Sequence, residues 1–234
     1  MKKKSATSTR TAKAKIRPAE LTETENFEVA EETPVQPAAD AHFPVVGIGA
    51  SAGGLEALET FLQNVPEQSG MAFVIVQHLD PTHKGIMVEL LQRATKMRVN
   101  QVRDRMPVEP DNVYVIPPNK DMSILHGALY LLTPVAQRGL RLPIDFFFRS
   151  LADDFQDRSV GVMLSGMGSD GTLGLRAIKE KAGAVFVQSP ESAKFDGMPR
   201  SSIDAGLADV VASAQELPTK IMAYLRHAPA VVRA

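Results

Sequence analysis

From Phe43 onward, the hydrophobic pattern alternates between two kinds of segment. Short runs rich in β-branched residues predict buried strands, and apolar residues three or four positions apart predict helices. The predicted strands are 45–49, 71–77, 113–118, 160–165, 184–188 and 208–211. The predicted helices are 55–65, 88–95, 143–155, 172–181 and 216–227. Residues 122–132 predict a β-hairpin that turns at His126-Gly127. This alternation indicates an α/β fold with a mostly parallel, doubly wound sheet that helices cover on both faces.

The two ends of the chain do not share this pattern. The first 17 residues carry seven basic side chains and no acidic one, and residues 18–40 carry seven acidic side chains and no basic one. Apolar residues are too sparse there to build a core, so we expect a disordered, charge-segregated tail over 1–41. A docking arm for an acidic surface is the alternative. The folded domain is then 42–227, followed by a short C-terminal tail at 228–234.

Composition narrows the function classes. The chain of 234 residues has a formal net charge of -1, which gives no sign of a nucleic-acid binder. It has no cysteine, which excludes disulfides, thiolate chemistry and a Cys-ligated metal. No apolar run is long enough to span a bilayer, and no signal-peptide core follows the N-terminus. We therefore expect a cytoplasmic protein that is not inserted in a membrane.

Three polar residues directly follow predicted strands. Ser51 follows the first strand, His78 follows the second, and Asp170 follows the strand 160–165. Ligand sites in parallel sheets lie outside the carboxyl ends of the strands, so these three side chains are expected to share one site. A nucleophile, a base and a carboxylate are the parts of acyl-transfer catalysis. The alternative for Ser51 and Asp170 is that each is the N-cap of the helix that follows it.

The sequence around Ser51 favours the catalytic interpretation. Residues 49–53, GASAG, match G-x-S-x-G, in which small neighbours permit the sharp turn that exposes the serine hydroxyl. The helix that begins just after Ser51 offers free backbone N–H groups to a developing oxyanion. The order Ser…His…Asp differs from the Ser…Asp/Glu…His order of common α/β-hydrolases, which disfavours that fold but not the chemistry.

Two other kinds of site are weaker candidates. GMGSDG, 166–171, fits the dinucleotide pattern G-x-G-x-x-G, but the ribose-binding acid expected near 188–190 is missing. His78, Asp80 and His83 cluster in one segment as candidate zinc ligands, but no other segment offers clear partners. We therefore expect neither a metal nor a cofactor.

Four motifs then carry a resemblance to a known family. IGASAGG, VQHLDPTHKG, MLSGMGSDGTLG and ESAKFDGMPRSSIDAG, between about Phe43 and Leu225, resemble the catalytic domain of CheB-type chemotaxis methylesterases. In spelling they are most similar to the CheB domains that begin CheB–CheR fusion proteins. The resemblance implies a three-layer α/β/α domain with a sheet of about seven strands.

The resemblance also implies an activity and its residues. The activity is hydrolysis of glutamate methyl esters, and in many members deamidation of glutamines, on methyl-accepting chemotaxis receptors, within a phosphorelay signalling pathway. The catalytic triad of the family falls on Ser51, His78 and Asp170, and its oxyanion-hole backbone N–H falls on Met167. The family needs no cofactor. A CheR-type methyltransferase is the implied partner, and a non-catalytic adaptor that keeps the fold is the alternative function.

This sequence departs from the family in two respects. Ala52 stands where many members have Thr, so any contribution of a hydroxyl at that position is lost. The usual N-terminal receiver domain is not expected in the 41-residue tail, so regulation by receiver phosphorylation is not expected either.

The sequence also supports expectations about a few further side chains. Ser165 and Ser169 are the next candidates for the nucleophile, and His83 is the rival of His78. Arg200 is either a receptor contact or an ordinary surface arginine. The three consecutive phenylalanines 146–148 are expected in the core.

Overall fold

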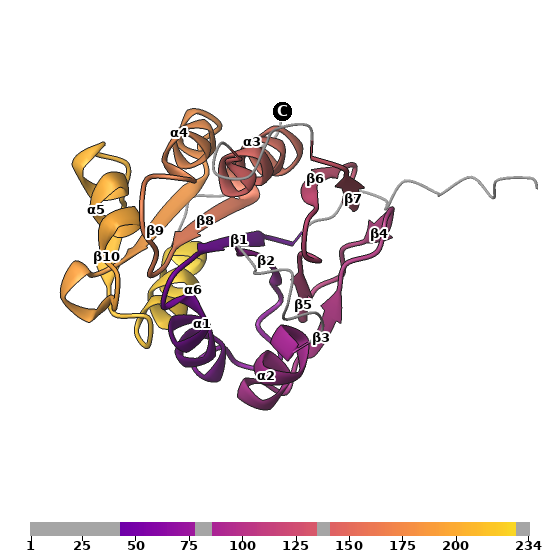
Figure 1. Cartoon of the computed structure of the whole chain (residues 1–234). Helices are drawn as coiled ribbons and strands as arrows, with labels where there is room; N and C mark the ends of the chain where they lie inside the picture. The colour runs from indigo at the N-terminus through magenta and orange to yellow at the C-terminus, as the bar shows by residue number, and fades with distance from the viewer. Residues whose placement is uncertain (1–42, 78–85, 135–140, 228–234) are drawn as a thin grey trace, which may run out of the picture. The chain divides into compact units, whose positions relative to one another are not determined.

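The computed structural model describes residues 43–77, 86–134 and 141–227 (Figure 1). Its main sheet has seven strands in the order β10-β9-β8-β1-β2-β5-β3, and every neighbouring pair is parallel. The strands are β1 (Val45–Ala50), β2 (Ala72–Gln77), β3 (Arg98–Gln101), β5 (Asn112–Val115), β8 (Ser159–Met163), β9 (Ala184–Gln188) and β10 (Val210–Ala212). The expected parallel α/β sheet is confirmed.

A small antiparallel sheet contains the predicted hairpin. Its strand order is β4-β7-β6, formed by β4 (Met106–Pro107), β6 (Asp121–Leu125) and β7 (Ala128–Leu132). The hairpin turns at His126 and Gly127, whose φ angles are 51° and 71°. Positive φ at both positions of a two-residue loop is the conformation that matches the twist of the flanking strands, so this prediction is confirmed.

Helices cover the two faces of the main sheet, as Figure 1 shows. The helices α1 (Gly54–Gln63), α2 (Ile86–Ala94) and α6 (Leu217–His227) pack on one face, around Phe61, Leu91 and Ile221. The helices α3 (Pro143–Phe155), α4 (Thr172–Glu180) and α5 (Gly197–Asp204) pack on the other, around Phe147, Ile178 and Met198. Short 3₁₀ turns follow α3 at 156–158 and β9 at 190–192. The structure is thus the three-layer α/β/α arrangement.

The structure differs from the sequence-based expectations at four places. The edge strand β3 was not expected, nor were the two-residue strand β4 and the helix α5. Phe146 was expected in the core, but its side chain is 43% exposed. The buried face of α3 includes Ile144, Phe147, Phe148 and Leu151, and Phe146, two residues after Ile144, points away from that face.

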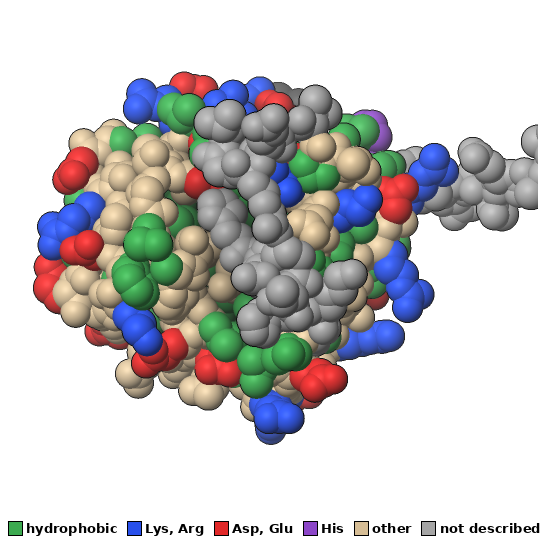
Figure 2. Space-filling view, in the orientation of Figure 1, with side chains coloured by type: hydrophobic (Ala, Val, Ile, Leu, Met, Phe, Trp, Pro, Cys, Tyr) green, Lys and Arg blue, Asp and Glu red, His purple; other side chains and the backbone are tan. Residues whose placement is uncertain are grey.

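Charged side chains of both signs lie at the surface. On the face seen in Figure 2, Lys and Arg side chains are interspersed with Asp and Glu, and the hydrophobic side chains form separate small groups. Within the described part of the chain, none of the helices has both the length and the apolar character to cross a membrane.

The chain reverses its winding between β1 and β8. These strands are neighbours and parallel, but β1 leads into α1 on one face of the sheet and β8 leads into α4 on the other. The connections therefore diverge at the carboxyl ends of β1 and β8. Such a switch point is where open α/β sheets place their ligand sites.

Candidate active site

Ser51 lies in the turn that leaves β1 at this switch point. Its backbone N–H donates to the carbonyl oxygen of Ser165 at 3.0 Å, and its carbonyl oxygen accepts from Gly54 N–H at 2.9 Å. Gly53 has a φ of +69°, and a Cβ built on it would lie 2.8 Å from Ser165 Oγ, so the turn requires glycine there. Gly53 is the N-cap of α1 and the cap has no side-chain hydrogen bond. The alternative that Ser51 caps this helix is therefore wrong.

The loop after β8 lies directly beside Ser51. Leu164 N–H donates to Gly49 O at 2.9 Å, which extends the β1–β8 pairing to the end of the strands. A Cβ built on Gly166 would lie 3.0 Å from Ser51 Cβ and 2.1 Å from Met198 Sδ. A side chain at 166 would therefore displace Ser51 or α5, which explains the glycine in the motif.

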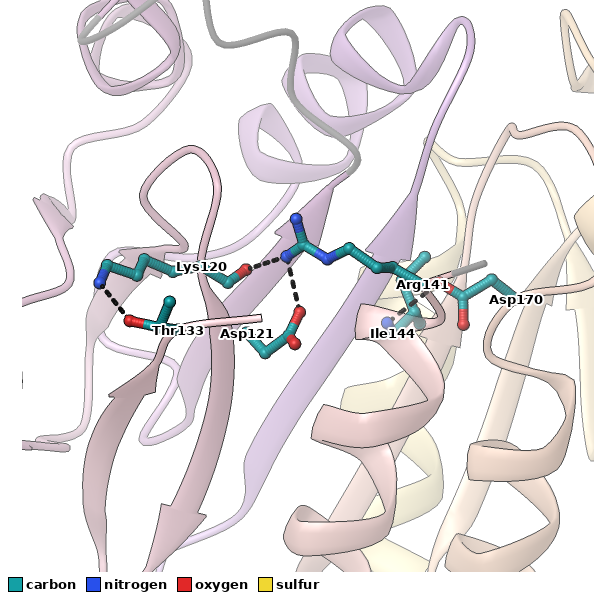
Figure 3. A network of polar contacts seen from close by, with 6 residues as sticks. All are labelled: Lys120, Asp121, Thr133, Arg141, Ile144 and Asp170. Atoms are coloured by element: carbon teal, nitrogen blue, oxygen red, sulfur yellow. Dashed lines mark hydrogen bonds and ion pairs between the residues drawn. The ribbon is translucent and has the colours of Figure 1, made fainter. Parts of the chain in front are cut away.

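Asp170, at the end of this loop, holds the N-terminus of α3. Its carboxylate accepts hydrogen bonds from the backbone N–H of Asp145 at 2.9 Å and of Ile144 at 3.1 Å. Figure 3 shows the Ile144 contact. Asp170 is only 4% exposed. Backbone N–H groups at a helix N-terminus are ready donors to a carboxylate, so this contact fixes the position of Asp170. The N-cap of α4 is Gly171, so the alternative that Asp170 caps the following helix is also wrong.

Asp145 makes the reciprocal contact. This buried residue, in the first turn of α3, accepts a hydrogen bond from Gly174 N–H of α4 at 2.6 Å. Burial raises the pKa of the Asp145 carboxyl, the Gly174 hydrogen bond opposes that rise, and the charge of Asp170 adds to it. Asp170, just before α4, therefore binds the N-terminus of α3, and Asp145 of α3 binds the first turn of α4. Sequence reasoning missed Asp145, and its one signal was an acidic residue in the first turn of a helix that begins with Pro143.

Arg141 ties the start of α3 to the antiparallel sheet. Its Nη2 donates to Asp121 Oδ1 at 2.7 Å and to the Lys120 carbonyl oxygen at 3.0 Å. Figure 3 shows the guanidinium extending toward β6 while Ile144 faces Asp170. Because Arg141 is only two residues before α3, this ion pair helps to fix the helix end that holds Asp170.

Met167 lies in the same loop, with its side chain 62% exposed. Among the backbone hydrogen bonds that join described residues, Gly166 N–H donates to Phe195 O at 2.9 Å, whereas Met167 N–H is not a donor. A Cβ built on Gly197, at the start of α5, would lie 3.4 Å from Met167 Cα. The backbone at Met167 thus lies against the start of α5.

The other serines of the loop differ from Ser51. Ser165 is 1% exposed, which argues against it as a nucleophile. Ser169 is exposed, and its carbonyl oxygen accepts from Thr172 N–H at 3.2 Å. Arg200 is at the surface and pairs with Asp196 of the preceding turn at 2.5 Å.

His78 lies outside the described residues, as do Asp80 and His83 of the alternative zinc cluster. Among the residues that are described, no group of His, Cys, Asp and Glu is arranged to hold a metal ion. Of the predicted site residues, the structure therefore places Ser51 beside the loop that contains Met167 and Asp170.

Comparisons with known proteins identify relatives of this chain. The chain is 32% identical over 177 residues to a Leptospira interrogans protein named putative protein-glutamate methylesterase/protein-glutamine glutaminase, which covers 75% of this chain and 92% of that protein. It is 44% identical over 143 residues to an uncharacterised 104.1 kDa protein of Rhodobacter capsulatus, covering 61% of this chain and 15% of that protein. The chain spans about half the length of several other curated methylesterases that it matches.

A solved structure and a family model also match this chain. The crystal structure of the Thermotoga maritima CheB methylesterase catalytic domain matches with a TM-score of 0.72 and 29% identity, over 77% of this chain and 98% of that one. The family model described as CheB methylesterase matches residues 46–221. The order of the strands, the loops at the switch point and these matches together show that the chain belongs to the CheB methylesterase family.

Proposed function

We propose that this protein is a serine hydrolase that demethylates glutamate methyl esters, and deamidates glutamines, on methyl-accepting chemotaxis receptors. The observation that carries the proposal is the junction of the turn that contains Ser51 with the loop that contains Met167 and Asp170, at the switch point of the sheet. The names of the relatives supply the substrate class, because they are called glutamate methylesterases and glutamine glutaminases.

In the proposed mechanism, Ser51 Oγ attacks the γ-acyl carbon of the receptor side chain while His78 takes the hydroxyl proton. The tetrahedral intermediate collapses as the bond to the leaving group breaks, and His78 returns the proton to methanol or ammonia. Water then attacks the acyl-enzyme by the same route, which releases glutamate and restores Ser51. Ester and amide share the acyl-enzyme, so one site serves both reactions.

Two other residues complete this proposal. The N-terminus of α3 fixes the Asp170 carboxylate through two backbone hydrogen bonds, which suits it to hold the His78 tautomer and to stabilise the imidazolium. The Met167 backbone N–H is the proposed donor to the oxyanion. The proposal requires no metal and no cofactor.

The proposal also implies a partner enzyme and a cellular location. Methyl esters on receptor glutamates must be made by a methyltransferase, and we place a CheR-type enzyme as the partner that supplies the substrate. We also propose that this protein acts in the cytoplasm.

The test is release of methanol from methylated receptor fragments by the wild type, Ser51→Ala and Ser169→Ala. Loss of a triad nucleophile lowers kcat by about 10⁴–10⁶-fold, so Ser51→Ala should be inactive. Ser169→Ala is the matched control, because it removes an exposed serine from the neighbouring loop and should keep nearly full activity.

A fluorophosphonate probe separates the chemistry from the choice of substrate. Labelling of Ser51 without methanol release would show a hydrolase with a different substrate. Absence of both in the folded wild type would favour the adaptor alternative, and activity above about a tenth of wild type in Ser51→Ala would place the nucleophile elsewhere.

A further inference from the structure

We propose that Ser165, anchored by Gln188, is a positioning residue that fixes the turn carrying Ser51 relative to the loop carrying Met167. This inference rests on the proposed function, because it takes Ser51 as the nucleophile. It assigns no contact between Ser165 and the substrate.

The Ser165 hydroxyl joins two segments that are far apart in sequence. Its Oγ donates to the Ala52 carbonyl oxygen at 2.9 Å and accepts from Phe195 N–H at 3.0 Å. Ala52 is the residue after the proposed nucleophile, and Phe195 lies just before α5. A serine hydroxyl has one hydrogen to donate, and the Ala52 carbonyl oxygen at 2.9 Å is nearer to it than the other acceptor, the Phe195 carbonyl oxygen at 3.3 Å.

The backbone of Ser165 is held as firmly as its side chain. Its N–H donates to Oε1 of the buried Gln188 at 2.9 Å, and its carbonyl oxygen accepts from Ser51 N–H at 3.0 Å. Gln188, at the end of β9, in turn donates through Nε2 to the Ser192 carbonyl oxygen at 3.0 Å. A continuous chain of hydrogen bonds therefore runs from β9 through Ser165 to the backbone of Ser51.

The segment that Ser165 binds also supports the proposed oxyanion donor. Gly166 N–H donates to Phe195 O, and Met198 N–H donates to Gly166 O, each at 2.9 Å. The Ser165 hydroxyl thus links the turn that carries Ser51 to the segment around Phe195, which also supports the backbone around Met167. A displacement of about 1 Å between reacting groups can cost about 10²-fold in rate, so this link matters for kcat.

The chain offers a matched control on the neighbouring strand β8. Ser159 is fully buried at the amino end of β8, and its Oγ also donates to a backbone carbonyl oxygen, that of Gln156. Ser159→Ala removes the same kind of group from the start of β8 as Ser165→Ala removes from the loop that follows β8. Both should lower the free energy of unfolding, but only one lies at the site.

The experiment measures kcat and KM for methanol release, the rate of Ser51 labelling by a fluorophosphonate, and the melting temperature of each variant. We expect Ser165→Ala to lower kcat and the labelling rate by about 10–100-fold while KM changes less than about threefold. Ser159→Ala should stay within about twofold of the wild type in kcat, KM and labelling rate, although its melting temperature falls. Gln188→Leu, which keeps the hydroxyl but leaves the Ser165 N–H unpaired, should lower kcat in the same direction and serves if Ser165→Ala fails to fold.

Two outcomes would overturn the inference. One is a kcat and labelling rate in Ser165→Ala within twofold of the wild type. The other is an equal loss in Ser159→Ala, which would reduce the effect to general stability. If the wild type neither hydrolyses the ester nor labels at Ser51, the proposed function fails and this inference fails with it. If the wild type is active and Ser165→Ala stays within twofold of it, only this inference fails. The two failures are therefore distinguishable.

Discussion

At the scale of single residues, two buried carboxylates connect α3 with the start of α4. Asp170 accepts from the first turn of α3, and Asp145 of α3 accepts from Gly174 of α4. An unpaired buried charge is costly, so these backbone donors are what permit two carboxylates to lie so close together. The catalytic proposal uses one of the pair, and the other keeps its support in place.

The first prediction concerns Asp170→Asn. The amide keeps one acceptor for the N-terminus of α3 but loses the charge that holds the histidine tautomer and stabilises the imidazolium, so kcat should fall by about 10³–10⁴-fold. Asp209→Asn is the control, because Asp209 also accepts from a backbone N–H, that of Val185 at 2.8 Å, and pairs with Lys179 away from the site. Methanol release should drop in the first variant only, and an equal drop in both would contradict the role of Asp170.

The second prediction is a pH dependence of stability caused by Asp145. Burial raises its pKa in the folded state above the ordinary value of 3.8, so the folded protein binds this proton more readily than the unfolded chain does. Stability from this group is therefore present below pH 3.8 and is lost as the pH rises through the folded-state pKa. Asp145→Asn removes this titration.

Urea unfolding of the wild type and Asp145→Asn at a series of pH values from 3.5 to 7 checks this prediction. The free energy of unfolding of the wild type should decrease relative to that of Asp145→Asn as the pH rises. A difference that stays constant, or that grows in favour of the wild type, would show that the pKa is not raised.

How far the site could be predicted depends on the residue. Ser51 and Asp170 could be placed at one edge, because Ser51 directly follows β1 and Asp170 lies in the loop after β8, and both are buried strands of a parallel sheet. Asp145 and Gln188 could not, because their partners are backbone groups of other elements, brought close only by packing. Ser165 was noticed as a hydroxyl in the right loop, but only its burial shows that it supports the nucleophile instead of replacing it.

At the scale of elements, the strongly apolar strands and periodic helices were predicted, and three weakly patterned elements, β3, β4 and α5, were not. β3, with the sequence RVNQ, is an edge strand with one buried residue, Val99, so it carries little hydrophobic signal. α5 begins Gly-Met-Pro and owes its position to the burial of Met198 beside Gly166. Tertiary packing, and not local propensity, decides β3 and α5.

The third prediction tests the packing of α3 on α4 through Gly174→Ala. In an ordinary helix this change stabilises by about 0.5–1 kcal/mol. Here a Cβ at 174 would lie 2.5 Å from Phe148 Cβ and 3.0 Å from Asp145 O, so the helices must separate and the Asp145–Gly174 hydrogen bond must lengthen. We expect a net loss of about 1–3 kcal/mol, together with reduced kcat.

Urea unfolding gives the sign of the effect. Thr219→Ala on the exposed side of α6 is the control, and it should follow helix propensity with a gain of a few tenths of a kcal/mol. A stabilised Gly174→Ala with full activity would show that α3 and α4 are not as closely packed as the structure indicates.

At the scale of the whole molecule, the site follows from the winding of the chain. β1 and β8 are more than 100 positions apart in sequence, yet they are paired in register from Val45 opposite Ser159 to Gly49 opposite Met163. The sequence indicates parallel strands, but it does not state which strands are neighbours. That adjacency is what converts two separate motifs into one candidate site.

The last prediction concerns where the folded domain begins. Residues 1–41 contain few apolar side chains, so their deletion should leave kcat unchanged and shift Tm by less than about 1 °C. Deletion of 1–44 is the matched comparison, since it also removes Phe43, whose ring lies 6.5 Å from that of Phe155, and Pro44, whose carbonyl oxygen accepts from Ala72 N–H at 3.1 Å. That loss should be on the order of 2 kcal/mol, or about 4–8 °C in Tm. Thermal unfolding of both variants with methanol release decides the matter: a large fall in Tm or kcat on deleting 1–41 alone would show that the charged N-terminal segment belongs to the working enzyme.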